Sequence, residues 1–374
     1  MRILVAHQVP RARTGGMSRL MGFVHDRVAA AGHEVDYLCA DDVPARWSGA
    51  YGRRVAFPLA VRARVTAAAR EGCGYDVVNV HEPSAAPAVF ARKRNGNAAV
   101  VVTSHGLERR AWALAKEEAR FGREAPGWRT RLLYPPSGLW AGSWALRGAD
   151  HVFCLNEEDR YELVEQLGRP AHTVTRITPG ADLVFAMIAG GRDYARRLRL
   201  LFAGTWRKNK GTEDLVPAFT ALARRHESLS LRVVGAGVPS GSVQERFPED
   251  VRSRVSCATP SDERGTAEEF AAADIFVLPS LFEGTPLTLM QAMMSGLPIV
   301  TTATCGMKDV VVDRRNGLLV PIRRPDLVSA AVEALLADCG LRAGLGTSAR
   351  SDALQRHTWD CAAEPVLRAY ENLV

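Results

Sequence analysis

Short apolar runs alternate with helical stretches along this chain, and that alternation constrains its fold more than any other feature. Strands that are apolar along most of their length are typical of parallel sheets with helices on both faces. The pattern therefore predicts a doubly wound α/β architecture. We expect strands at residues 2–7, 34–39, 77–81, 99–104 and 151–155 in the first half, and at 198–203, 231–234, 254–258, 275–278, 299–302 and 317–320 in the second.

The length of 374 residues predicts two domains, because it exceeds what one ordinary hydrophobic core organises. Residues 178–191 contain a Pro-Gly and a Gly-Gly pair, which are typical of a junction. We expect a first domain at 1–180 and a second at 181–359. Residues 360–374 are expected to form a closing helix.

The composition favours a cytoplasmic protein. No segment approaches the ~20 apolar residues that cross a membrane, and residues 1–6 are expected to form a strand instead of a signal peptide. The seven cysteines are scattered and never form a CxxC pair, which favours reduced thiols and argues against structural zinc.

The excess of positive charge lies in the first half of the chain. Residues 1–180 hold 25 Lys and Arg against 18 Asp and Glu, whereas residues 181–374 hold 23 of each. A solvated basic surface explains this, and so does attraction to an anionic lipid or acceptor. Peripheral contact with the inner face of a membrane is therefore one expectation. Nucleic acid is not an expected partner, since no recognised binding motif accompanies the charge.

Residues 126–145 combine three tryptophans with basic residues around a Pro-Pro turn. They are expected to form either an interfacial or acceptor-recognising segment, or simply packed helices.

Residues 274–298 predict a binding pocket. A buried strand is followed by a polar loop and by a helix that is expected to begin with Thr285 as N-cap and Pro286 as its first residue. The helix is apolar almost all round and should be buried, so Gln291 inside it needs a partner. Glu283 lies in the loop beside the helix N-terminus, where anions bind. The ligand is expected to carry phosphate.

This segment resembles the signature of the retaining glycosyltransferases of family 4, a P-S-x-x-E-G loop followed by a helix that ends A-M-x-x-G-x-P. The matching residues are Pro279, Ser280, Glu283, Gly284, Ala292, Met293, Gly296 and Pro298. The resemblance implies the α/β GT-B fold, in which two Rossmann-like doubly wound domains face each other across a cleft. The first would bind the acceptor and the second the nucleotide sugar, and the helix at 360–374 would pack back on the first domain. In that family the first carboxylate, here Glu283, lies by the donor sugar and its phosphate.

A second glutamate of the family holds the ribose hydroxyls of the nucleotide, and Gln291 occupies its position here. An amide still forms hydrogen bonds but loses their charge-assisted part, on the order of 1 kcal/mol per bond. We therefore expect weaker or altered nucleotide binding, which a glutamate at this position should strengthen.

Residues 202–211 follow an expected strand and open a helix, an arrangement that favours an anion site. They resemble the family's G-R-x-x-x-x-K-G loop, whose Arg and Lys grip the nucleotide diphosphate. The residues that match in spacing are Gly204, Lys210 and Gly211. Thr205 replaces the arginine, so Arg207 is expected to supply the cation, with Lys208 as the second choice. A solvated charged turn is the alternative, and it has more weight for Arg207 than for Lys210.

Glycine turns after other strands fit the same kind of site. Gly15 and Gly16, between the first strand and the first helix, let backbone amides meet a phosphate and are similar to the family's N-terminal glycine pair. Gly235 resembles the strand-end glycine of the nucleotide domain, whereas the NAD fingerprint fails because Ser240 replaces its third glycine. Two further residues stand at the family's turn beside the diphosphate, Gly306 and Met307.

His105 directly follows an expected strand and matches the family's T-x-H-G motif, whose histidine contacts the hydroxyls of the donor sugar. Without that context, a histidine at a strand end is as often only a satisfied polar residue. Glu82 follows the preceding strand and is expected to meet the acceptor, as is Glu108.

The resemblance implies transfer of a sugar from a nucleoside diphosphate sugar, UDP- or GDP-linked, to a hydroxyl or amine of a glycan, lipid or small-molecule acceptor, with retained configuration. No Asp-x-Asp occurs, so neither a metal nor another cofactor is expected. The expected catalytic residues are His105, Arg207, Lys210 and Glu283. The expected donor-binding residues are Gly15, Gly16, Gly204, Lys208, Gly235, Gly284, Thr285, Pro286, Leu287, Gln291, Gly306 and Met307.

Three other functions remain open from the sequence. An epimerase or hydrolase of nucleotide sugars would use the same pocket. A non-catalytic nucleotide-sugar-binding protein is suggested by Gln291 and Thr205. An NAD-dependent oxidoreductase has the least support, because its glycine fingerprint is missing.

Overall fold

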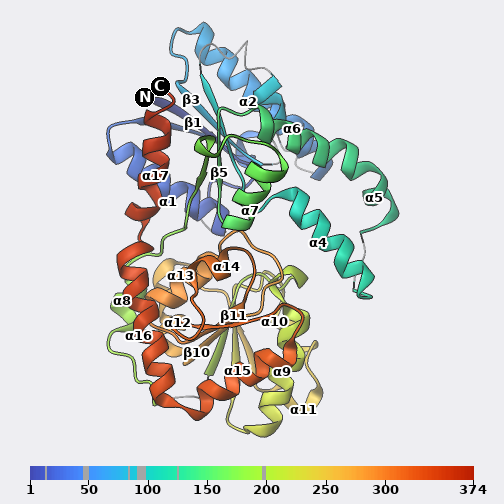
Figure 1. The fold of residues 1–374 in the computed structure, drawn as a ribbon, viewed down its shortest axis with the longest axis vertical. Helices are drawn as coiled ribbons and strands as arrows, with labels where there is room; N and C mark the ends of the chain where they lie inside the picture. Colours follow the sequence, from blue (N-terminus) through green and yellow to red (C-terminus); the bar gives the residue numbers. More distant parts are fainter. Residues whose placement is uncertain (13–14, 45–49, 83–84, 91–97, 124–125, 196–198) are drawn as a thin grey trace. The chain divides into compact units, whose positions relative to one another are not determined.

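The computed structural model describes residues 1–374 except 13–14, 45–49, 83–84, 91–97, 124–125 and 196–198 (Figure 1). The chain divides into two compact units, one comprising Met1–Thr178 and Trp359–Val374, the other Pro179–Thr358. The boundaries expected from the sequence fall after residues 180 and 359. In the part of the chain that the structure describes, each unit is built on a six-stranded parallel sheet.

The sheet of the first unit has the strand order β2-β1-β3-β4-β5-β6. β3 and β4 are buried along their whole length and pair in register, with His81 opposite Thr103. The sequence pattern does not predict β6, because this strand has three residues and only Val174 is buried. The strands are β1 (Arg2–Ala6), β2 (Glu34–Leu38), β3 (Val77–His81), β4 (Ala99–Thr103), β5 (His151–Cys154) and β6 (Val174–Arg176).

The last helix of the chain packs on the first helix of this unit. Trp359 stacks on Phe23 with ring centroids 4.8 Å apart, and Tyr370 Oη lies 2.9 Å from His25 Nε2. Asn79 donates to the same hydroxyl at 2.7 Å. The helices are α1 (Gly16–Ala30), α2 (Ala50–Arg70), α3 (Ala86–Phe90), α4 (Glu108–Arg120), α5 (Trp128–Tyr134), α6 (Trp140–Gly148), α7 (Glu157–Tyr161) and α17 (Trp359–Glu371).

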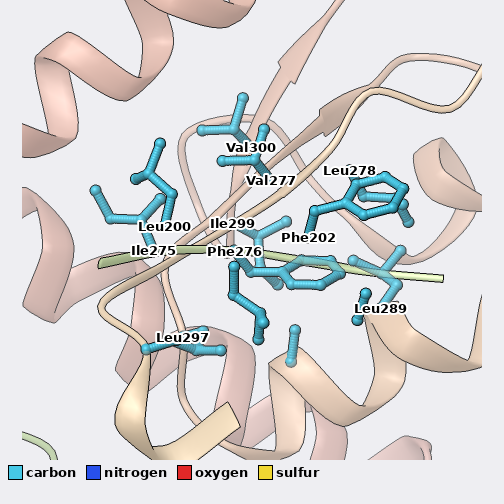
Figure 2. Packing of buried hydrophobic residues seen from close by; sticks show 14 of the residues in the cluster. Leu200, Phe202, Ile275, Phe276, Val277, Leu278, Leu289, Leu297, Ile299 and Val300 are labelled. Atoms are coloured by element: carbon cyan, nitrogen blue, oxygen red, sulfur yellow. The ribbon is translucent and has the colours of Figure 1, made fainter. Parts of the chain in front are cut away.

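The sheet of the second unit has the order β12-β11-β10-β7-β8-β9. Figure 2 shows its core, where side chains of β7, β10 and β11 gather with Leu289 and Leu297. The sequence pattern predicts all six strands to within two residues at each end. They are β7 (Arg199–Ala203), β8 (Ser230–Val234), β9 (Val255–Ala258), β10 (Ile275–Leu278), β11 (Ile299–Thr302) and β12 (Leu318–Val320).

Helix α13 is buried as predicted, but it begins one residue later than expected. Its N-cap is Pro286, with extended ψ of 125°, and its first helical residue is Leu287. Thr285 does not cap the helix, because it is buried against Gly306 of the next helix. The helices of this unit are α8 (Val184–Ala189), α9 (Thr212–Arg225), α10 (Ser240–Gln244), α11 (Glu249–Arg252), α12 (Glu263–Ala272), α13 (Leu287–Met294), α14 (Cys305–Val310), α15 (Pro325–Ala337) and α16 (Cys339–Arg356).

Among the described residues, no helix combines the length and the apolar character needed to cross a bilayer.

Candidate functional site

The turn after β7 is shaped by two glycines. Gly204 has φ of +145°, and a Cβ there would lie 3.5 Å from Lys210 Cε, so the lysine stem covers this glycine. Gly211 has φ of +71°, and a Cβ there would lie 1.8 Å from the carbonyl oxygen of Pro279. Only glycine allows this backbone to approach the loop after β10 so closely.

Backbone contacts join the two loops. The amide of Leu281 donates to the carbonyl of Asn209 at 2.8 Å, and the Asn209 side chain donates to the carbonyl of Phe282 at 3.4 Å. The Thr302 hydroxyl at the end of β11 donates to the carbonyl of Ser280. Because the strands are parallel, these loops share the carboxyl edge of the sheet, where ligands of doubly wound folds bind.

At this edge the structure brings together Lys210 and Glu283. Lys210 Nζ lies 2.6 Å from Glu283 Oε1, and the two side chains are only 16% and 13% exposed. The Ser280 hydroxyl donates to the same carboxylate oxygen at 3.2 Å. The sequence predicts both residues as catalytic, and the structure adds that they are partners.

The two other cations of the loop lie apart from this pair. Lys208 Nζ lies 2.9 Å from Glu213 Oε1, in the first turn of α9. Arg207 is exposed and precedes the short helical turn Lys208–Lys210. Thr205 stands where the family has an arginine. Of the two residues expected to supply that cation instead, Arg207 is exposed, whereas Lys208 already has a carboxylate partner.

The turn into α14 packs against the loop of Glu283. The amide of Gly306 donates to the carbonyl of Gly284 at 2.9 Å, and a Cβ on Gly306 would lie 2.0 Å from Thr285 Oγ1. Met307 is fully buried in the apolar core, so its side chain is not available to a ligand. Leu287, at the start of α13, is half-buried.

Gln291 has a partner that the sequence does not indicate. It is 1% exposed, and its Nε2 donates to Glu263 Oε1 at 3.2 Å. Glu263 is the first residue of α12, the helix that follows the edge strand β9. The Glu263 carboxylate thus lies beside position 291, where the family has a glutamate and this chain has a glutamine.

The turn after β8 leaves room in front of its backbone. Gly235 has φ of +71°, and no atom would lie within 4 Å of a Cβ at this position. Its amide donates to the carbonyl of Ala258 at 2.9 Å. Gly235 is therefore at the same carboxyl edge as Gly204, one strand away.

In the first unit, His105 forms a pair with His81. His81 Nδ1 lies 2.7 Å from His105 Nε2, and the rings stack with centroids 4.9 Å apart. His7 lies edge-on to His81 at 6.2 Å. Burial lowers the pKa of His105 to about 4 and holds the pKa of His81 well below its ordinary value, so both imidazoles are neutral at pH 7. The sequence does not single out His81, although it ends the strand next to that of His105.

Glu82 and Glu108 lie near the same ends of β3 and β4. Burial raises the pKa of Glu82 to about 8, and its Oε2 has no hydrogen-bond partner within the described part of the chain. Glu108 opens α4 and accepts a hydrogen bond from Tyr134 Oη. Glu82 is therefore a protonated carboxyl group at neutral pH, whereas Glu108 is held by a tyrosine.

The glycine pair before α1 lies at its N-terminus. Gly15 is the N-cap, its amide donates to Ser18 Oγ at 3.2 Å, and that hydroxyl donates back to its carbonyl at 3.0 Å. None of the described residues has an atom within 4 Å of a Cβ built on Gly16, so a side chain at this position would meet no neighbour among them.

Two units, each with a parallel six-stranded sheet and glycine-shaped loops at its carboxyl edge, are the architecture of the GT-B fold. The family described as Glycosyltransferase Family 4 matches residues 14–185, and that described as Glycosyl transferases group 1 matches residues 197–338. The chain belongs to the family 4 glycosyltransferases, and it is an enzyme that transfers a sugar.

Two relatives are D-inositol 3-phosphate glycosyltransferases. That of Xylanimonas cellulosilytica is 30% identical, over 79% of this chain and 72% of its own length. That of Kribbella flavida is 30% identical over 63% of this chain, and the match spans 59% of its length.

Solved structures share the fold at lower identity. Sucrose-phosphate synthase from Thermosynechococcus elongatus has a TM-score of 0.80 at 21% identity and covers 100% of this chain and 98% of its own. WaaG, a glycosyltransferase involved in lipopolysaccharide biosynthesis, has a TM-score of 0.75 at 18% identity, with 98% of each chain covered. Anabaena HepE, solved in complex with UDP and glucose, has a TM-score of 0.70 at 16% identity, with 99% of each chain covered.

Proposed function

We propose that this enzyme takes its sugar from a nucleoside diphosphate sugar, UDP- or GDP-linked, and transfers it with retained configuration and without a metal. The observation that carries the proposal is the Lys210–Glu283 pair between two glycine-shaped loops at the carboxyl edge of the sheet.

Lys210 is the group that neutralises the leaving diphosphate. Charge builds on the diphosphate as the glycosidic bond breaks, and a cation held beforehand in a poorly hydrated place stabilises it most. Lys210 meets this condition, because its stem lies on Gly204 and its ammonium is largely buried. Arg207 is exposed in the same loop and adds a second positive charge when the ligand binds.

Glu283 orients the donor sugar in this proposal. A carboxylate with a lysine at 2.6 Å is a poor nucleophile, since its charge is already neutralised. In this proposal the carboxylate accepts hydrogen bonds from sugar hydroxyls while Lys210 remains beside it. This supports a reaction on the front face of the sugar within an ion pair, in which no covalent glycosyl-enzyme forms.

His105 and Glu82 act on the acceptor side or on the sugar in this proposal. A neutral imidazole accepts or donates one hydrogen bond to a hydroxyl without adding charge. A protonated Glu82 has the same ability. The acceptor is a glycan, a lipid or a small molecule, and the names of the relatives make a phosphorylated polyol the first to try. Seven scattered cysteines, none of them in a disulfide, support a reducing compartment such as the cytoplasm.

The test is thermal stabilisation of the purified protein by UDP, GDP, ADP and TDP, with NAD as a negative control. A ligand at 100 times its dissociation constant adds about 2.7 kcal/mol to the free energy of unfolding. We expect one nucleoside diphosphate to raise the melting temperature of the wild type and of Arg246→Ala, an exposed control in the same unit, but not that of Lys210→Ala.

No stabilisation by any nucleoside diphosphate contradicts the proposal. Once the nucleotide is known, incubation of its sugar with and without acceptors separates transfer from hydrolysis or epimerisation, because only transfer requires an acceptor.

A further inference from the structure

A large hollow lies in the first unit, and none of the residues that line it is among the expected site residues. Its volume is about 1120 Å3, and its walls are one face of α4 and the segment from α5 to α6. On α4 the wall includes Arg109, Trp112, Lys116 and Arg120. These positions are three or four residues apart, so they lie on one face of the helix.

Part of the positive charge in the hollow has no ion-pair partner among the described residues. Arg109 lies 3.2 Å from Glu162, the one acidic residue among those that line it in the described part of the chain. None of the described residues forms an ion pair with Lys116, Arg120 or Arg131, all of which are exposed. Three cations converging on one concave surface favour an anionic ligand.

The helices that line the hollow also carry large exposed apolar side chains, of which Trp140 lines the hollow itself. Phe121 is 61% exposed, Trp128 70%, Leu132 66% and Trp140 61%. They come from the end of α4, from α5 and from the start of α6, and α4 and α5 extend away from the sheet of their unit (Figure 1). Tryptophan and leucine beside exposed basic residues are typical of surfaces that enter the interface of a bilayer.

The base of the hollow is firmly built. Trp112 and Tyr134 join α4 to α5 with ring centroids 5.3 Å apart, and Tyr134 Oη donates to the Glu108 carboxylate. Trp144 of α6 packs against the core of the unit. These contacts therefore fix α4, α5 and α6 relative to one another.

We infer that this hollow binds the anionic head group of a membrane lipid, while Phe121, Trp128 and Leu132 enter the boundary of the acyl chains. The combination of features points to a lipid. A soluble phosphate would need the cations but not the apolar side chains around them, and an acidic peptide or nucleic acid would not require bulky apolar groups that project from the unit. The net charge of +7 over residues 1–180 attracts this part of the protein to an anionic surface. The inference goes beyond sugar transfer and does not depend on it.

The experiment is flotation of the full-length protein with vesicles of phosphatidylcholine alone or mixed with phosphatidylglycerol. We expect binding to the mixed vesicles only. The triple variant Lys116→Gln, Arg120→Gln and Arg131→Gln should bind about fivefold more weakly for each charge removed, on the order of a hundredfold in all. Trp128→Ala with Leu132→Ala should also weaken binding, and that loss should persist at high salt, because it does not depend on charge.

The matched control removes three other exposed arginine charges, by Arg62→Gln, Arg70→Gln and Arg246→Gln. Far-ultraviolet circular dichroism and melting curves establish that each variant is folded. If the control loses as much binding as the triple variant, only net charge matters and the site is wrong. If wild-type protein binds neither kind of vesicle, or if inorganic phosphate binds the hollow while vesicles do not, the inference is overturned.

Discussion

Lys210 Nζ lies 2.6 Å from Glu283 Oε1, although 73 residues separate them in the chain. The pair exists because β7 and β10 are neighbours in the sheet and their loops are joined by Asn209. An exposed ion pair contributes little to stability, but this one is largely shielded from water and lies where a diphosphate is expected. The pair therefore holds a cation and a hydrogen-bond acceptor side by side at the place where the ligand is expected.

Removal of one member of this pair should lower the free energy of unfolding because its partner stays behind, whereas removal of both leaves no such partner. Lys210→Ala leaves the shielded Glu283 carboxylate without its cation, which should lower the free energy of unfolding by about 1–3 kcal/mol. The double variant Lys210→Ala, Glu283→Ala should be more stable than the sum of the two single changes predicts. Urea unfolding of the four proteins measures this coupling. If the changes add to within about 0.5 kcal/mol, the two side chains do not interact.

For transfer itself, Lys210→Ala should lower kcat by on the order of a hundredfold or more, since it removes a charge that acts on the leaving group. Lys208→Ala should cost far less, because Glu213 already holds that ammonium. Steady-state rates of both variants, measured with the sugar donor of the nucleotide identified by thermal shift, test this difference. Equal losses would mean that the loop contributes only its net charge.

The Glu263 contact reverses the expectation for Gln291→Glu. A glutamate there would lie about as far from Glu263 as the amide does now, 3.2 Å, so two carboxylates would face each other. We expect the single change to weaken both stability and nucleotide binding. The exchange Gln291→Glu with Glu263→Gln should restore them, because it again pairs one carboxylate with one amide. Calorimetric titration with the nucleotide and urea unfolding test this. Tighter binding by the single variant would show that Glu263 does not contact this position.

The raised pKa of Glu82 predicts a dependence of stability on pH. Its carboxyl stays protonated in the folded protein up to about pH 8 but ionises in the unfolded chain near its ordinary value of 4.5. Between these values Glu82 holds its proton in the folded state but not in the unfolded chain, so its contribution to stability falls as pH rises, by at most about 1.4 kcal/mol per pH unit. The lowered pKa of His105 acts in the opposite direction below about pH 6.5, so the quantity to compare is the difference between wild type and Glu82→Gln. Glu82→Gln should remove that decline. Urea unfolding from pH 5 to pH 8 measures it, with Glu165→Gln as an exposed control. Parallel profiles of wild type and Glu82→Gln would show that the carboxyl ionises normally.

Gly211→Ala should displace the loop that carries Lys210. The positive φ alone costs alanine roughly 1–2 kcal/mol, and the added Cβ would also lie 1.8 Å from a backbone oxygen of the loop after β10. We expect a larger loss of stability than the first effect explains, together with loss of nucleotide binding. Gly241→Ala in α10 is the control, because nothing lies within 4 Å of a Cβ there. Similar melting temperatures for the two variants would contradict this account of the turn.

Much of the fold follows from local patterns. The expected strands match the observed ones closely because most of them are short apolar runs that are buried in the sheet. β6 is missed because three residues, one of them buried, carry too little signal. The start of α13 is misplaced because Thr285, which looks like a cap, is buried against Gly306 instead.

The sequence alone determined the alternation of strands and helices, the family, and the glycines and charged residues of the loops, because these depend on neighbours within a few positions. Only the tertiary structure decided which side chains meet. Glu263 reaches Gln291, and His81 reaches His105, across 28 and 24 residues. Such pairs depend on strand order and register, which place the ends of distant strands together. No pattern within a single segment contains that information.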